Sequence, residues 1–165
     1  MTQTILRKLM LIAVLLTGSN VFAHDFEAQN SDGVTIYYNI ISATDLTCEV
    51  TYRGSSFDEY SGEYTGTVVI PTSVTNGENT YSVTSIGMFA FRDCSGLASV
   101  TIGNSVTSIG EGAFHGCNGL TSVYITDLEA WCKMDFVNSS ATPFYYADEL
   151  YLNNKLVTNI EIPNT

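Results

Sequence analysis

The apolar and polar positions of this chain repeat with a fixed period through its middle. Residues 83–102 read VTSIGMFAFRDCSGLASVTI and residues 106–125 read VTSIGEGAFHGCNGLTSVYI, and the two copies are identical at 13 of 20 positions. One coil alone cannot bury the apolar positions that both copies share, whereas stacked coils bury them against each other. The pattern therefore predicts a solenoid with full repeats at residues 83–105 and 106–125.

Short alternations of apolar, polar and apolar residues predict the strands of these coils. Val100-Thr101-Ile102 and Val123-Tyr124-Ile125 hold the same place in the two repeats, and stacking in register would make them a parallel ladder. Val68-Val69-Ile70 has the same sequence pattern ahead of the first full repeat, and the pattern recurs at Ile160-Glu161-Ile162. The Ala-Phe-x-x-Cys segment between the strands predicts a tight helical turn on the opposite wall.

The segments on either side of the full repeats carry different patterns. Val34–Ile40 and Leu46–Tyr52 alternate and are joined by a short polar turn, which predicts antiparallel strands. We expect residues 24–66 to form a β-rich N-terminal cap, because the open apolar end of a solenoid would aggregate. The solenoid itself is expected to span residues 67–165.

The last part of that span, residues 126–165, predicts a variant repeat that ends partway through its phrase. Thr126-Asp127-Leu128-Glu129 has the spacing of a capping box, which predicts a short helix through Trp131 and Cys132. Asn153-Asn154 separates two short apolar stretches and predicts a small hairpin.

The spacing from Val83 to Val106 lies in the period range of leucine-rich repeats, about 20–29 residues. Both copies match the phrase V-T-S-I-G-x-x-A-F-x-x-C-x-x-L-x-S-V-x-I, and on these residues the chain resembles the BspA-like bacterial leucine-rich repeat family. The resemblance covers roughly residues 64–165. Together with the pattern, it implies a β-rich leucine-rich-repeat solenoid, with a parallel strand ladder, short helical turns and an N-terminal antiparallel β cap. It also implies export or surface display, and adhesion to host proteins or other cells.

Residues 1–23 have the pattern of a secretory signal peptide. Arg7-Lys8 supplies positive charge, Leu9–Leu16 is a short apolar run, and Val21-Phe22-Ala23 is a cleavage site ahead of His24. The apolar run is far shorter than a membrane span, which needs roughly 20 residues. We therefore expect no membrane span and an exported protein, either extracellular or at the cell surface, with the periplasm as an alternative.

The net charge of the chain limits the classes of partner that it can be expected to bind. It has 6 basic and 17 acidic residues, a formal net charge of −11, and two of the basic residues lie in the predicted signal peptide. An acidic surface repels phosphate backbones and anionic membranes, so nucleic acid is not an expected partner. Extracellular or host proteins, or neighbouring cell surfaces, are the partners that we expect.

Motifs for catalysis are missing from the sequence. It has no Gly-x-x-x-x-Gly-Lys loop, no Gly-x-Ser-x-Gly elbow and no His-Glu-x-x-His pair. His115 takes the position of Arg92 one coil earlier, and positions that vary between coils usually face solvent. We expect a protein that is not an enzyme and that has no cofactor and no metal site. The alternative is a glycan-binding or degradative accessory protein with an unrecognised site.

Four cysteines allow three disulfide pairings, among which the sequence does not choose. Cys94 and Cys117 hold the same position one coil apart, which favours stacked buried thiols over a disulfide or a metal site. Cys48 and Cys132 are expected to be core residues as well. The acidic and aromatic segment Phe57–Tyr64 predicts a solvated loop, with calcium or sugar binding as alternatives.

The outward positions of the ladder are the main candidate for binding a partner. Solenoids bind extended partners on such faces, and tyrosine is favoured in interfaces because it combines contact area with a polar tip. The alternative is that these positions form only the polar side of a sheet. The candidate residues are Val69, Ser99, Thr101, Ser122, Tyr124 and Glu161.

Overall fold

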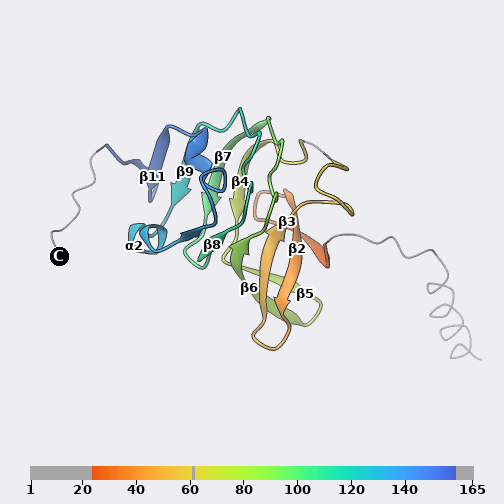
Figure 1. Cartoon of the computed structure of the whole chain (residues 1–165). Coiled ribbons are helices and arrows are strands. Elements are labelled where there is room, and N and C mark those ends of the chain that lie inside the picture. The colour runs from red at the N-terminus through yellow and green to blue at the C-terminus, as the bar shows by residue number, and fades with distance from the viewer. Residues whose placement is uncertain (1–23, 61, 159–165) are drawn as a thin grey trace, which may run out of the picture.

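The computed structural model describes residues 24–60 and 62–158, and within them the chain passes back and forth between two sheets (Figure 1). Sheet A has the strand order β1-β2-β3-β6-β8-β10, with β5 paired to β6, and sheet B has the order β12-β11-β9-β7-β4. The predicted signal peptide, residues 1–23, and the phrase Ile160-Glu161-Ile162 lie outside the described residues.

Sheet B contains the predicted ladder. Val100 pairs with Val68 on one side and with Val123 on the other, and all three side chains are fully buried. The parallel strands are β4 (Gly66–Ile70), β7 (Leu97–Ile102), β9 (Ser122–Ile125) and β11 (Glu149–Leu152). β12 (Lys155–Leu156) returns antiparallel to β11 through Asn153 and Asn154, whose φ angles of 50° and 64° suit a type I′ turn. The predicted ladder and hairpin are confirmed.

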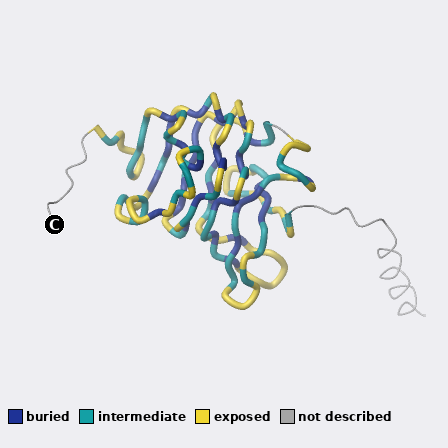
Figure 2. The backbone as a smooth tube through the Cα atoms, viewed as in Figure 1, coloured by how far each residue is buried: buried dark blue, intermediate teal, exposed yellow. Residues whose placement is uncertain are grey.

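Sheet A contains a second set of parallel pairs, which the sequence pattern did not predict. Val50, Ile86 and Ile109 are aligned across β3, β6 and β8, and all three are fully buried. The strands are β1 (Phe26–Gln29), β2 (Thr35–Ser42), β3 (Thr47–Thr51), β5 (Ser73–Asn76), β6 (Asn79–Ile86), β8 (Ser108–Ile109) and β10 (Asp135–Phe136). Apolar residues of both sheets form one core, and Figure 2 shows buried stretches along the strands and exposed residues at the hairpin loops.

The N-terminal strands extend sheet A at the end of the molecule opposite β11 (Figure 1). β1 and β2 pair antiparallel, as do β2 and β3, whereas β3 joins β6 in parallel. The expected antiparallel strands are therefore present. That they serve as a cap, and that a boundary falls at residue 66, remain predictions.

The Ala-Phe-x-x-Cys segments were predicted to be helical turns, and this prediction is wrong. Their N–H groups point in two alternating directions. In the first coil, Phe89, Phe91 and Asp93 donate to carbonyl groups of the next coil, with N–O distances of 2.7–3.1 Å. The residues between them donate instead to carbonyls three positions earlier within the same coil. An α-helix would direct every N–H along one axis, so the segment is a zigzag of turns that fastens neighbouring coils together.

The path from sheet A to sheet B has a constant length in the three coils that follow β6, β8 and β10, whereas the earlier path from β3 to β4 is longer. The aligned positions Ser85, Ser108 and Asp135 on sheet A are each followed, at one identical spacing, by the aligned positions Ser99, Ser122 and Glu149 on sheet B. The return path from sheet B to sheet A varies, because it also carries the β5–β6 hairpin in one coil and a helix in another. The irregular additions among these coils therefore lie on one side of the solenoid.

That helix is α2 (Leu128–Cys132), and it confirms the predicted position with a corrected cap. Asp127, rather than Thr126, is the N-cap residue, and its carboxylate accepts a hydrogen bond from the Ala130 N–H at 3.0 Å. Asp and Thr are both favoured at the N-cap position of a helix. The start of the helix is therefore one position later than the capping box indicated.

Candidate functional site

The predicted outward row runs straight across sheet B. Val69, Thr101 and Tyr124 are direct neighbours on β4, β7 and β9, and each is half-buried. Their flanking residues on the same strands point into the core, as the alternation of a strand requires. The sheet thus holds these three side chains in register on one face. That these side chains bind a partner remains a prediction.

Tyr151 extends this row and was missed by the sequence pattern. It lies beside Tyr124 on β11, and the two rings stack with centroids 4.5 Å apart and planes within 11°. The signal was present in Leu150-Tyr151-Leu152, which alternates like Val123-Tyr124-Ile125. Glu161, which was expected in this row, lies outside the described residues.

Ser99 and Ser122 form a second row that is less accessible than expected. Their exposed fractions are only 9% and 8%. The Ser99 hydroxyl donates to Thr67 Oγ1 at 2.9 Å, and the Ser122 hydroxyl donates to Glu149 Oε2 at 2.9 Å. These serines join the strands to each other, so they are poorly placed to contact a partner directly.

Glu149 also fixes one of the tyrosines. The Tyr151 hydroxyl donates to Glu149 Oε2 at 3.0 Å, and this hydrogen bond raises the pKa of Tyr151 above its ordinary value. A tyrosine held by stacking and by a hydrogen bond loses little conformational freedom on binding. The end of the row near β11 is therefore an aromatic patch with fixed geometry.

Three of the four cysteines are buried thiols. Cys48, Cys94 and Cys117 are reduced and buried, and burial raises the pKa of Cys48 and of Cys117 to about 12. The Cys117 thiol donates to the Phe91 carbonyl at 3.0 Å. Cys132 was expected in the core, and this prediction is wrong. The residue lies on the solvent side of the short helix α2 and is exposed.

The segment Phe57–Tyr64 is only partly the solvated loop that was expected. Asp58 and Glu59 are exposed, but Phe57 packs on Phe89 with ring centroids 4.4 Å apart. Tyr64 is a core residue with 1% exposure, and its ring packs against Phe91 with centroids 4.7 Å apart. Phe57 and Tyr64 therefore anchor the segment to the first coil.

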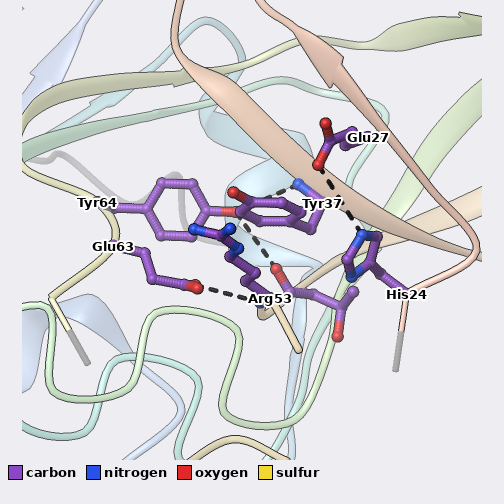
Figure 3. Close-up of polar contacts among 7 residues, drawn as sticks. His24, Glu27, Tyr37, Arg53, Glu63 and Tyr64 are labelled. Carbon is purple, nitrogen blue, oxygen red and sulfur yellow. Dashed lines mark hydrogen bonds and ion pairs between the residues drawn. The ribbon is translucent and has the colours of Figure 1, made fainter. Parts of the chain in front are cut away.

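Tyr64 also ties the segment to the N-terminal strands, as Figure 3 shows. Its hydroxyl accepts from the Tyr37 N–H and donates to the Thr51 carbonyl, both at 3.3 Å. Beside it, Glu63 Oε2 accepts from the Arg53 N–H at 3.2 Å, while Glu63 Oε1 is buried without a hydrogen-bond partner. Burial raises the pKa of Glu63.

His24 and His115 have different surroundings. The His24 ring lies edge-on to Tyr37 with centroids 4.8 Å apart and is 4.0 Å from Glu27, and burial lowers its pKa (Figure 3). His115 is exposed on its turn, as predicted.

Among residues 24–60 and 62–158 no three His, Cys, Asp or Glu side chains are grouped to hold a metal ion. In the same part of the chain no helix is long and apolar enough to cross a membrane.

Comparison with known proteins places the repeats in a family. Residues 70–150 match the model of the BspA type leucine rich repeat region, in six copies. No curated protein matches the chain.

Several solved structures are similar. A leucine-rich repeat protein from Bacteroides ovatus is 30% identical, with a TM-score of 0.49, over 65% of this chain and 24% of its own. A leucine rich cell surface protein from Faecalibacterium prausnitzii is 28% identical, with a TM-score of 0.44, over 62% and 24%. A leucine-rich repeat protein from Bacteroides capillosus is 28% identical, with a TM-score of 0.45, over 76% and 97%. The chain thus spans about a quarter of the length of the first two proteins.

Proposed function

Over residues 70–150 this chain belongs to the BspA-type leucine-rich repeat proteins, and from that premise we propose that it binds other proteins at the cell surface. The proposed partners are extracellular or host proteins, or proteins on neighbouring cells. The protein acts by binding and not by catalysis. Its binding face is the outward row of sheet B, here defined as Val69, Thr101, Tyr124 and Tyr151.

The observation that carries this proposal is the stacked pair of tyrosines on that row. Tyr124 and Tyr151 lie on adjacent strands, with ring centroids 4.5 Å apart, and both are half-buried. Rigid tyrosines give large contact area at low conformational cost, and they are enriched among residues that dominate binding energy. Sheet B is favoured over sheet A because β8 and β10 have only two residues each.

Export is part of the same proposal. Its support is the charged, apolar and small-residue order of residues 1–23, which is typical of a cleaved signal peptide. N-terminal sequencing of the extracellular protein should begin at His24. Recovery of the protein in the cytosol with Met1 retained would contradict export while leaving the binding face untouched.

The binding face is tested by measuring affinity for a panel of immobilised extracellular-matrix proteins and for whole bacterial cells. Tyr124→Ala and Tyr151→Ala should each weaken binding about thirtyfold, as expected for loss of about 2 kcal/mol at an interface hot spot. Both variants should keep the circular dichroism spectrum of the parent, because neither ring belongs to the core cluster.

Two controls separate binding from folding. Tyr145→Ala removes a tyrosine that is 66% exposed and lies outside sheet B, so binding should be unchanged. Phe114→Ala removes a fully buried ring and should destabilise the protein by about 3–5 kcal/mol. Parent-like binding by both row variants, together with loss of binding on a change in Phe57–Tyr64, would move the site to the N-terminal end.

A further inference from the structure

A small open pocket lies between the second and third coils, away from the row on sheet B. Its volume is about 240 Å³, and it is lined by His115 from the second coil and by Ser139, Ser140, Tyr145 and Tyr146 from the third. The two tyrosines belong to, or directly follow, the 3-10 helix η2 (Pro143–Tyr145). Nothing in the proposed protein-binding function uses this pocket.

The pocket lies where the fastening between coils changes. The Asp93 N–H of the first coil donates to the His115 carbonyl, but the equivalent N–H of the second coil, at Gly116, donates to the Tyr146 hydroxyl at 2.9 Å. The ring stack changes at the same place. Phe91 and Phe114 stack at 5.1 Å, but the spacing of the paired residues Ser122 and Glu149 puts Ala141 at the equivalent position of the third coil. The Tyr146 hydroxyl therefore takes the place of a backbone carbonyl in the fastening, and the phenylalanine stack does not continue at residue 141.

The lining groups are held in place before any ligand arrives. The Tyr146 hydroxyl is fixed by Gly116, and both the N–H and the hydroxyl of Ser140 donate to Asn138 Oδ1, at 3.1 and 2.8 Å. Thr142 caps η2 by accepting from the Phe144 N–H at 3.3 Å. Fixed polar groups around a cavity favour binding, because little ordering remains to be done.

The chemistry of the lining selects a class of ligand. The described residues that line the pocket include no Lys, Arg, Asp or Glu, which disfavours both anions and metal cations. They offer hydroxyls and an imidazole, each able to donate and accept, and a purely apolar ligand would leave these groups without partners. Tyr145 adds a ring that is 66% exposed and lies against Tyr146, with centroids 5.0 Å apart.

We propose that this pocket binds one neutral pyranose ring, as the terminal sugar of a glycan. A pyranose presents hydroxyls around its edge and C–H groups on its face, which match the polar lining and the exposed Tyr145 ring respectively. The volume is somewhat below the roughly 300–1,000 Å³ typical of sites for drug-sized ligands, as suits a single sugar ring. The proposal stands apart from protein binding, because it uses a different surface.

The test is titration of the purified protein with methyl glycosides of glucose, galactose, mannose and N-acetylglucosamine, followed by saturation-transfer NMR. At least one should bind with a Kd of about 1 mM, and saturation should transfer from aromatic protons. Tyr145→Ala should weaken that binding at least tenfold. Tyr145→Phe, which keeps the ring, should stay within about threefold of the parent.

Tyr124→Ala is the matched control, because it removes a tyrosine from the row on sheet B. It should bind the sugar like the parent, while Tyr145→Ala should bind proteins like the parent, so each proposal can fail without the other. Glycerol controls for weak binding of any polyol. Absence of binding by all four glycosides, equal binding by Tyr145→Ala, or equal binding of glycerol would overturn the sugar site.

Discussion

Individual side chains in this molecule act mainly by joining one coil to the next. Tyr64, Phe91 and Phe114 come from successive coils, and their rings follow each other at 4.7 and 5.1 Å through the core. The repeat pattern predicted Phe91 and Phe114 as core residues because they recur at the same position. It missed Tyr64, since this residue follows a loop of acids and precedes Phe91 by a longer spacing than the one that relates Phe91 to Phe114. Side chains outside the regular spacing need knowledge of the fold to be placed.

Glu63 gives a prediction at this scale. Its carboxylate is partly buried, one oxygen lacks a partner, and burial raises the pKa above the unfolded value of 4.5. The folded state therefore holds a proton to higher pH than the unfolded state, so this group lowers stability as pH rises from 4.5 through its folded pKa. Glu63→Gln removes the charge. The free energy of unfolding of the variant, relative to that of the parent, should therefore rise by about 1 kcal/mol as the pH increases from about 4.5 to about 8.

Urea unfolding of parent and variant at both pH values measures this gain. The titration of His24, whose lowered pKa acts with the opposite sign below pH 6.5, is common to both proteins and cancels in the difference. Glu78→Gln controls for loss of one negative charge at an exposed position. A difference that stays constant with pH, or that matches Glu78→Gln, would show that Glu63 carries no desolvation cost.

At the scale of elements, the turns show where pattern reasoning was insufficient. The spacing Ala-Phe-x-x-Cys fits a helical turn, and only the neighbouring coil reveals that every second N–H is used between coils. The zigzag needs residues whose backbone is in the left-handed conformation, with positive φ. The first coil uses Phe89 and Asp93, at φ 58° and 56°, and the second uses Gly112 and Gly116, at 58° and 79°. Glycine adopts this conformation without strain, whereas L side chains do not.

A pair of glycine variants tests how tightly the turns are packed. Gly77, in the β5–β6 hairpin, has φ 62° and open space around it, so Gly77→Ala should cost about 1 kcal/mol from backbone strain alone. Gly116 also has a positive φ, but a Cβ there would clash with Asp93 Oδ1 and would lie 3.0 Å from the Asp93 Cα. Gly116→Ala should therefore cost about 2–3 kcal/mol. Denaturant midpoints decide; equal losses would mean that the turns are loosely stacked.

On the scale of the whole molecule, the ladder of sheet B, its period and the antiparallel strands β2 and β3 could be predicted, but the parallel pairs of sheet A could not. The ladder strands repeat an apolar-polar-apolar phrase, whereas β8 and β10 have two residues each and offer too little alternation to recognise. The candidate row was predicted at Val69, Thr101 and Tyr124, but its aromatic partner Tyr151 was not. The pocket beside Tyr145 also had no sequence signal, because its residues come from two coils.

The reactivity of the four cysteines reports on the intact fold. A thiol reacts as its thiolate, and burial both shields Cys48 and Cys117 and raises the pKa of each to about 12. A thiol reagent at about pH 8 should therefore label one cysteine rapidly in the native protein, the exposed Cys132, and four after unfolding. Cys132→Ser should abolish the rapid phase. Only two labelled thiols after unfolding would reveal a disulfide.

The paths between the two sheets show how such a molecule can grow. The paths from sheet A to sheet B that follow β6, β8 and β10 are equal in length, whereas the path from β3 to β4 carries the Phe57–Tyr64 loop and is longer. The return path has already absorbed a hairpin in one coil and a helix in another without altering the ladders. The connection between Ile102 and Ser108 carries neither, so it is the natural place to graft a foreign peptide. In evolution, as in engineering, this scaffold can acquire new loops between its strands while its two sheets stay as they are.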